Sequence, residues 1–207
     1  MLWYAKIGDL DAVAKSKVAN IQHLVQYAKD GYAILTAIPI CTLMFKQEIP
    51  LMFPDDADTK LVQEAMWDPF EYLIARKKDG LLKTNFKKPL GKINYHTPCH
   101  GRVQNIGKKT EVFLKLIPKT TINIVGRCSG HSGTYGVKKE HHKMAMKIGK
   151  PVARLMSSNE PDYISSDCQL AGHHIQQMMT EINLINAAKP AQLTHPLSLF
   201  RIAYGIE

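Results

Sequence analysis

Three of the four cysteines in this chain follow segments whose composition is typical of β-strands. Cys99, Cys128 and Cys168 each lie two or three residues beyond such a segment. Because the carboxyl ends of parallel strands meet at one edge of a sheet, we expect the three thiols to converge there. Thiolates are soft donors that select iron–sulfur clusters or zinc. The spacing therefore predicts a metal centre, with three buried structural cysteines as the alternative.

The loop around Cys128 has glycine at every third position from 130 to 136. Backbone N–H groups in such a loop, ahead of a helix, can donate to the sulfide of a cluster or to a phosphate. We therefore expect Gly130, His131 and Gly133 to contact a cofactor. His131 also stands three residues after Cys128, a common spacing for paired metal ligands, and it is the candidate fourth ligand. The alternative for His131 is a side chain that faces solvent or hydrogen-bonds a backbone carbonyl.

Other histidines near the cysteines carry less weight. His100 is a second, weaker candidate ligand, because imidazole ligation is the minority pattern in iron–sulfur centres. Two pairs of adjacent histidines fall on predicted helices and are expected on exposed faces: His141, His142, His173 and His174.

The segments that must position these residues alternate between strand and helix patterns from about residue 91 onward. The order β-α-β-α-β-α predicts a three-layer α/β unit with a parallel sheet between helices. In one of the helices, apolar residues recur every three or four positions. They are Met144, Ile148, Val152 and Leu155. The expected strands are 92–96, 121–125 and 162–166, and the expected helices are 110–116, 137–156, 170–185 and 196–204.

The first 45 residues repeat the last part of this pattern. A glycine, a helix, a strand and a cysteine follow one another from Gly8 to Cys41 and again from Gly136 to Cys168, over 33 and 32 positions. In the first of these segments the strand is expected over 32–36. We infer a duplication with a period near 128 residues. On this alignment the first copy lacks its upstream part, so the chain is expected to be truncated at its N-terminus. Cys41 is then expected to be a leftover buried thiol.

The duplication also predicts how the chain is organised. Residues 1–50 are the trailing part of a first repeat. Residues 51–90 form a helical and basic connector, and residues 91–207 form the complete second domain with a C-terminal helix.

The charge of the chain narrows the classes of partner. The chain has 27 Lys and Arg against 18 Asp and Glu, a net charge of +9. The basic pairs lack interleaved aromatics and a recognition-helix pattern, which argues against nucleic acid. Three interpretations of the positive charge remain: a solvated basic surface, contact with an acidic redox partner, or contact with an anionic membrane face. With no 18-residue uncharged apolar run and no secretory signal, the sequence predicts a cytoplasmic protein, at most attached to the inner face of the membrane.

The strings around the three cysteines, taken together, resemble a known family. Tyr95-His-Thr-Pro-Cys-His100, Cys128-Ser-Gly-His-Ser-Gly and Ser166-Asp-Cys-Gln-Leu-Ala-Gly172 are similar to the cysteine-rich CCG domain. That domain occurs, usually twice, in iron–sulfur subunits of heterodisulfide reductase, of glycolate oxidase and of anaerobic glycerol-3-phosphate dehydrogenase.

The resemblance implies a cluster, expected to be 4Fe–4S, with zinc as the less favoured substitute. This chain departs from the family at two positions. Ser129 stands at the second cysteine of the family's Cys-Cys-Gly, and Ala171 replaces its last cysteine. Only three thiolates therefore remain in the second copy. In the first copy, Met44 stands at the final cysteine position, so no cluster is expected there.

The resemblance implies an iron–sulfur electron-transfer module that relays electrons between a partner dehydrogenase and a quinone or thiol acceptor. The sequence has no Ser-His-Asp, His-Glu-x-x-His or Walker motif, as expected of an oxidoreductase component rather than a self-sufficient catalyst. One alternative is a nucleotide or phosphate site at Gly130, Gly133 and Gly136, although the Gly-x-Gly core is missing. The others are a cysteine-nucleophile enzyme using Cys99 or Cys128, and a non-functional fragment of a longer iron–sulfur protein.

Overall fold

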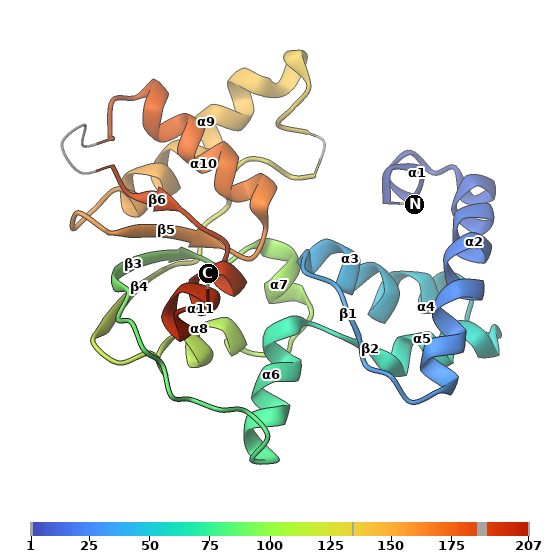
Figure 1. Ribbon diagram of the computed structural model, residues 1–207. Coiled ribbons are helices and arrows are strands. Elements are labelled where there is room, and N and C mark those ends of the chain that lie inside the picture. Colours follow the sequence, from blue (N-terminus) through green and yellow to red (C-terminus); the bar gives the residue numbers. More distant parts are fainter. Residues whose placement is uncertain (1, 134, 186–189, 207) are drawn as a thin grey trace. The chain divides into compact units, whose positions relative to one another are not determined.

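The computed structural model describes residues 2–133, 135–185 and 190–206 (Figure 1). It divides into two compact units, Met1–Tyr72 and Leu73–Glu207. We call them the N-terminal unit and the C-terminal unit and describe each by itself.

The C-terminal unit is built on a four-stranded parallel sheet in the order β4-β3-β5-β6. The strands are β3 (Gly91–His96), β4 (Thr120–Val125), β5 (Tyr163–Ser166) and β6 (Gln192–Leu193). His96, at the end of β3, is in register with the last residues of both β4 and β5. Three adjacent strands therefore end level with one another. This sheet confirms the predicted parallel α/β architecture.

Helices cover both faces of this sheet (Figure 1). On one face lie α9 (Lys139–Met156) and α10 (Gln169–Glu181). On the other lie α8 (Lys109–Leu114) and α11 (Pro196–Tyr204). These are the four helices that the periodicity predicts. The helix expected over 170–185 ends earlier, at Glu181, because Asn183 adopts a left-handed conformation that terminates it.

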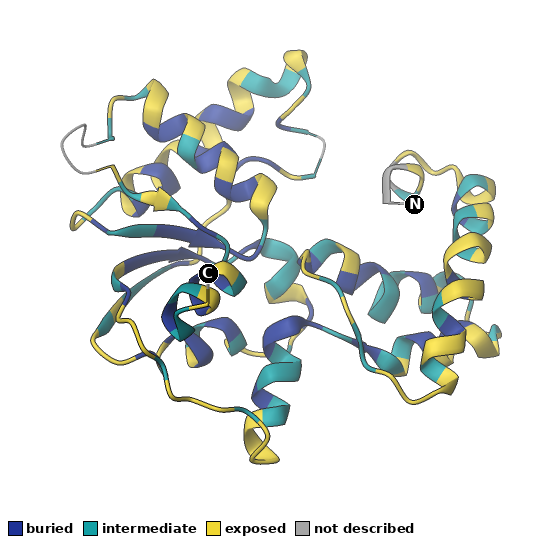
Figure 2. Ribbon diagram, in the orientation of Figure 1, coloured by how far each residue is buried: buried dark blue, intermediate teal, exposed yellow. Residues whose placement is uncertain are grey.

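The core between the sheet and α9 with α10 is apolar (Figure 2). α9 contributes Met146, Val152 and Met156 to it, all less than a tenth exposed. Of the apolar residues that predicted this helix, only Val152 is buried; the other three are exposed by 42–50%. α9 thus has an exposed apolar stripe beside its buried face, formed by Met144, Ile148 and Leu155.

The N-terminal unit is mainly helical and has a small sheet of its own. Its two strands, β1 (Ile34–Leu35) and β2 (Met66–Trp67), pair in parallel over two residues each. The strand expected over 32–36 is therefore short, and Leu35 is 47% exposed. The core of this unit lies between α2 (Leu10–Lys29) and α5 (Ala57–Ala65) and includes Ile21, Val25, Val62 and Met66.

The helices of the N-terminal unit follow local signals in the sequence. α2 begins after Asp9, whose carboxylate accepts a hydrogen bond from the Ala12 N–H at 2.9 Å. Pro39 and Pro69 each start a helix, where a missing N–H costs nothing. The helical segments are α1 (Leu2–Ile7), α2 (Leu10–Lys29), α3 (Pro39–Leu43), the π-helical turn η1 (Met44–Glu48), α4 (Ile49–Met52), α5 (Ala57–Ala65) and α6 (Pro69–Lys78), the last of which continues into the C-terminal unit.

Candidate functional site

Three cysteines follow the three adjacent strands of the C-terminal unit. Cys99 is the first residue of α7 (Cys99–Val103), directly after β3 and the N-cap residue Pro98. Cys128 lies in the loop after β4, and Cys168 is the N-cap residue of α10, two residues after β5. Cys99 and Cys168 are half-buried, and Cys128 is exposed. All three are free thiols on the same edge of the sheet.

Each of the three sulfur atoms has an N–H donor nearby. The Arg102 guanidinium donates to Cys99 Sγ at 3.5 Å, and the Gly130 N–H donates to Cys128 Sγ at 3.4 Å. The N–H groups of Leu170 and Ala171 hydrogen-bond to Cys168. Such donors stabilise a thiolate, and the N-terminal end of the 13-residue α10 adds its positive dipole.

Electrostatics link two of these cysteines. Burial raises the pKa of the Cys168 thiol, the N–H groups of Ala171 and Leu170 oppose that rise, and the charges of Asp167 and Cys99 add to it. Cys99 thus lies close enough to Cys168 for its charge to act on it. A metal ion that binds this edge must displace the proton of Cys168.

The donor set is incomplete compared with the CCG pattern. Ala171 is buried and offers no ligand atom. Ser129 is also buried, and its hydroxyl accepts a hydrogen bond from the His131 N–H at 3.4 Å. Over residues 2–133, 135–185 and 190–206, no group of three or more His, Cys, Asp or Glu side chains is already arranged to hold a metal ion. The three thiols fit an iron–sulfur cluster in donor type and in their place on the sheet, and the cluster would draw them together.

A buried histidine connects the strand ends beneath the cysteines. His96 Nε2 donates to the Arg127 carbonyl oxygen at 2.9 Å, and the Ser166 hydroxyl lies 3.1 Å from Nδ1. A carbonyl only accepts, so Nε2 carries the proton and Nδ1 accepts from Ser166. The same hydroxyl accepts from the Cys168 N–H at 3.3 Å. Burial lowers the pKa of His96, in keeping with a neutral ring. His96 therefore connects the backbone of Arg127, directly before Cys128, to Ser166, the last residue of the strand before Cys168.

A buried carboxylate supports the same edge. Asp167 accepts hydrogen bonds from the Tyr95 hydroxyl and, at 3.0 Å, from the Thr110 hydroxyl. Its backbone oxygen lies 3.1 Å from His195 Nε2. The sequence patterns above do not single out Asp167 or His96. The available signals were their places, Asp167 directly before a cysteine and His96 at the end of a predicted strand. A buried polar side chain at such a place needs a hydrogen-bond partner.

His131 lies among other histidines. It is 5% exposed, and its ring centre is 5.7 Å from that of His174. The His142 and His174 rings are 6.3 Å apart, and these three residues line a pocket together with His173. The expectation that His174 lies on an exposed face is therefore wrong: it is 6% exposed, because its side of α10 packs toward α9.

Glycines of the Cys128 loop have a packing role. Gly130 has a φ of +79°, and a Cβ there would lie 2.2 Å from the Ala145 carbonyl oxygen. A Cβ on Gly136 would lie 3.1 Å from His131 Cα. Gly130 therefore needs glycine for the loop to pack against α9, whatever the loop binds, and Gly136 leaves little room for a side chain. Gly133 has a positive φ of 65° as well.

Cys41 differs from the other cysteines in its environment. It is exposed, so the expectation of a buried thiol is wrong. The reason is local: Pro39 starts α3 two residues earlier, so Cys41 lies within the first turn of a helix instead of at its N-cap.

Comparison with known proteins agrees with the cysteine strings. Residues 93–176 match the model of the CCG cysteine-rich domain family. The chain is 27% identical over 172 residues to a subunit of anaerobic glycerol-3-phosphate dehydrogenase of Escherichia coli K12, covering 82% of this chain and 42% of that protein. It is 38% identical over 103 residues to an uncharacterized iron-sulfur protein of Methanocaldococcus jannaschii, covering 48% of this chain and 20% of that protein.

The chain spans less than half the length of these curated relatives. Among the described residues, no helix has the length and apolar character needed to cross a membrane. The family match covers most of β3, all of β4 and β5, and the three cysteines that follow them. Residues 93–176 are therefore similar to the CCG cysteine-rich domain, within a chain that is similar to iron–sulfur proteins.

Proposed function

We propose that the C-terminal unit holds an iron–sulfur cluster through Cys99, Cys128 and Cys168 and serves as an electron-transfer module of a dehydrogenase. The observation that carries this proposal is that the three thiols follow three adjacent parallel strands. The N–H donors at all three sulfur atoms support it, because the negative charge of a cluster is stabilised by such donors.

When bound, the cluster would supply one-electron transfer. The residues of the chain would hold it in place and tune it. Arg102 and the N-terminal end of α10 place positive charge beside the thiolates, which favours the reduced, more negative state. His96 and Asp167 hold the three strand ends at fixed positions through buried hydrogen bonds.

The proposed cluster is of the 4Fe–4S type with three protein thiolates. Neither Ser129 nor Ala171 supplies the family's further cysteines, so one iron would take a ligand other than cysteine. His131 is the candidate within the chain. Its ring lies beside His174, so ligation by His131 requires the ring to leave that contact.

The proposed partner is a dehydrogenase that delivers electrons, with a quinone or a thiol compound as the acceptor. The name of the Escherichia coli relative describes a subunit of an anaerobic dehydrogenase, which supports a partner of that class. Attachment to a membrane face would suit a quinone acceptor and the net charge of +9.

A nucleotide or phosphate site in the Cys128 loop receives less support. Gly130 and Gly136 are explained by the close approach of neighbouring backbone, so they do not require a phosphate. The cluster proposal in contrast accounts for the position of all three cysteines.

Anaerobic reconstitution with iron and sulfide tests the proposal. We expect a brown protein with broad absorption near about 400 nm that dithionite bleaches, and iron and sulfide in equal amounts. A colourless protein with one zinc per chain would replace the cluster with a structural metal. A colourless protein that retains neither metal would overturn the proposal.

A further inference from the structure

The exposed side of α9 combines an apolar stripe with a row of positive charge. Met144, Ile148 and Leu155 are exposed by 50, 44 and 42% and recur at intervals of four and seven residues, so they lie on one line along the helix. Val137, 69% exposed in the turn just before the helix, is a further exposed apolar side chain. The stripe borders the buried face that packs on the core, since Ile148 lies one turn from buried Val152.

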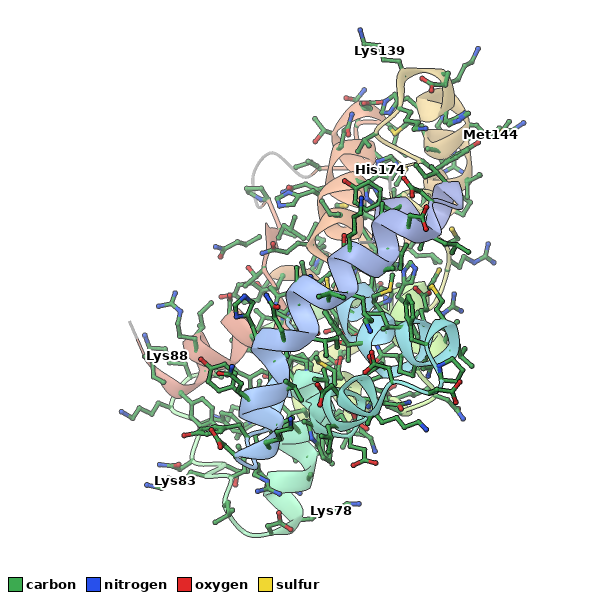
Figure 3. All side chains as sticks on the ribbon, turned by 90° about the vertical axis from the view of Figure 1, so that its right-hand side faces the viewer. Lys78, Lys83, Lys88, Lys139, Met144 and His174 are labelled. Atoms are coloured by element: carbon green, nitrogen blue, oxygen red, sulfur yellow. The ribbon has the colours of Figure 1, made fainter. Side chains whose placement is uncertain are left out.

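The positive charges lie beside this stripe. On a helical wheel with 100° per residue, they lie between the stripe and the edge of the buried face that is farther from the stripe. All five are exposed: Lys139, Lys143, Lys147, Lys150 and Arg154. Figure 3 shows Lys139 and Met144 at the outer edge of this unit. Within the part of the chain that the structure describes, none of the five forms an ion pair.

We propose that this face of α9 is a docking surface for an acidic amphipathic helix of a protein partner. Apolar side chains at helical spacing are the anchors that a helix uses to lie along another helix. Five cations on one flank, against the single carboxylate of α9, that of Glu140, select a partner with Asp or Glu on the matching flank and fix its direction. Met144 suits such a contact, because its flexible thioether adapts to the side chains it meets.

Other occupants of this face fit less well. A second copy of the chain would bring two rows of cations together, which costs free energy. An anionic membrane would attract the cations, but the stripe has no Trp or Phe, the residues typical of a helix lying in a membrane interface. Both remain distinguishable by experiment.

The test measures binding of a designed peptide to the full chain by fluorescence anisotropy. The peptide is a 15-residue helix with leucines at every third or fourth position and glutamates on one flank, and its counterpart has lysine in place of each glutamate. We expect the acidic peptide to bind, binding to weaken with added salt, and the basic counterpart to bind at least tenfold more weakly.

Variants identify the surface that binds. Ile148→Glu is expected to weaken binding of the acidic peptide at least tenfold, and the double variant Lys143→Glu/Lys147→Glu at least fivefold. Val112→Glu, at an apolar position 48% exposed on α8, and Lys77→Glu/Lys78→Glu, on α6, are the matched controls and should leave binding unchanged. Circular dichroism confirms that each variant is folded.

Several results would overturn the proposal. They are equal binding of both peptides, no effect of Ile148→Glu in a folded protein, binding to phosphatidylserine vesicles without binding to the acidic peptide, and a dimer that Ile148→Glu dissociates. The assay reads binding and not electron transfer, so its failure is distinguishable from failure of the proposed cluster.

Discussion

The two units of this chain share an order of elements but differ in what surrounds the central strand. In the N-terminal unit, α2, β1 and α3 follow one another, and β2 comes after η1, α4 and α5. In the C-terminal unit, α9, β5, α10 and β6 follow one another directly, and both strand pairs are parallel. β5 also pairs with β3, which in turn pairs with β4. Among the described residues, β1 pairs only with β2, over two residues.

If the proposed function holds, this difference explains why Cys168 would serve as a ligand and Cys41 would not. Cys168 caps a 13-residue helix beside two further strands that end level with its own. Cys41 lies within a five-residue helix and is exposed. The neighbouring strands supply both the other two thiols and the buried hydrogen bonds that hold them. A cysteine without such neighbouring strands has no other thiol placed beside it.

The largest expected effect separates the cysteines of the two units. Cys128→Ser should abolish cluster retention after reconstitution, because only three thiolates are present and a hydroxyl is a poor ligand for iron in its place. Cys41→Ser should retain iron and sulfide at the wild-type level. Iron and sulfide assays on both desalted proteins measure this. Equal loss in the two variants would erase the proposed distinction between the units.

The next effect concerns the loop that carries Cys128. Gly130→Ala places a Cβ against the Ala145 carbonyl oxygen at a positive φ, and we expect it to lower the free energy of unfolding by about 2 kcal/mol or more. Gly126→Ala is the matched control, because no atom lies within 4 Å of a Cβ there. Urea unfolding of the metal-free proteins compares them. A stable Gly130→Ala protein would mean that the loop is free to move away from α9.

His96 tests the hydrogen bonds beneath the edge. His96→Ala removes a ring that is 1% exposed and both of its hydrogen bonds, and we expect a loss of about 2–3 kcal/mol in the free energy of unfolding. Ser166→Ala, which leaves the ring in place, should cost less, about 1 kcal/mol. If both variants unfold like the wild type, the strand ends are held by packing alone.

The same histidine predicts a dependence of stability on pH. Burial lowers the pKa of His96 in the folded chain below its usual value of 6.5, so the unfolded chain binds more protons in this range. Stability should therefore fall as pH decreases through 6.5, and the fall should continue down to the folded pKa. His96→Gln should give a shallower fall between about pH 7.5 and 5.5. Urea midpoints of the metal-free proteins at each pH check this; an identical slope would assign the effect to another group, such as His174.

The smallest effect lies in the N-terminal unit. Asp9→Ala removes the cap of α2, a hydrogen bond to the Ala12 N–H on an exposed part of the chain, and should cost about 1 kcal/mol. Amide hydrogen exchange should accelerate in the first turn of α2 and remain unchanged in α9. Faster exchange in both helices would mean that the two units unfold together.

The elements that the sequence predicts well are those with local signals. The strands over 91–96 and 120–125 lie within one residue of their predicted bounds. β4 is rich in β-branched residues, and in β3 Ile93 and Tyr95 alternate with polar residues. α11 has its predicted bounds, because Pro196 opens it and Gly205 closes it in a left-handed conformation.

Features that depend on distant neighbours escape such signals. α9 has apolar residues on two faces, and only packing decides that Val152 is buried while Ile148 is exposed. β6 is only two residues long, too short for a periodic pattern. The contacts of His96 and Asp167 span more than 25 residues of sequence, so a single string does not disclose them.

Thiol footprinting tests directly whether Cys99, Cys128 and Cys168 bind one cluster. The reconstituted and metal-free proteins are alkylated with iodoacetamide under anaerobic conditions, and mass spectrometry reports the modified fraction at each cysteine. We expect the cluster to protect Cys99, Cys128 and Cys168 together from alkylation, while Cys41 is modified equally in both states. Protection of Cys41, or reconstituted protein in which one of the other three reacts as fast as in the metal-free protein, would contradict it.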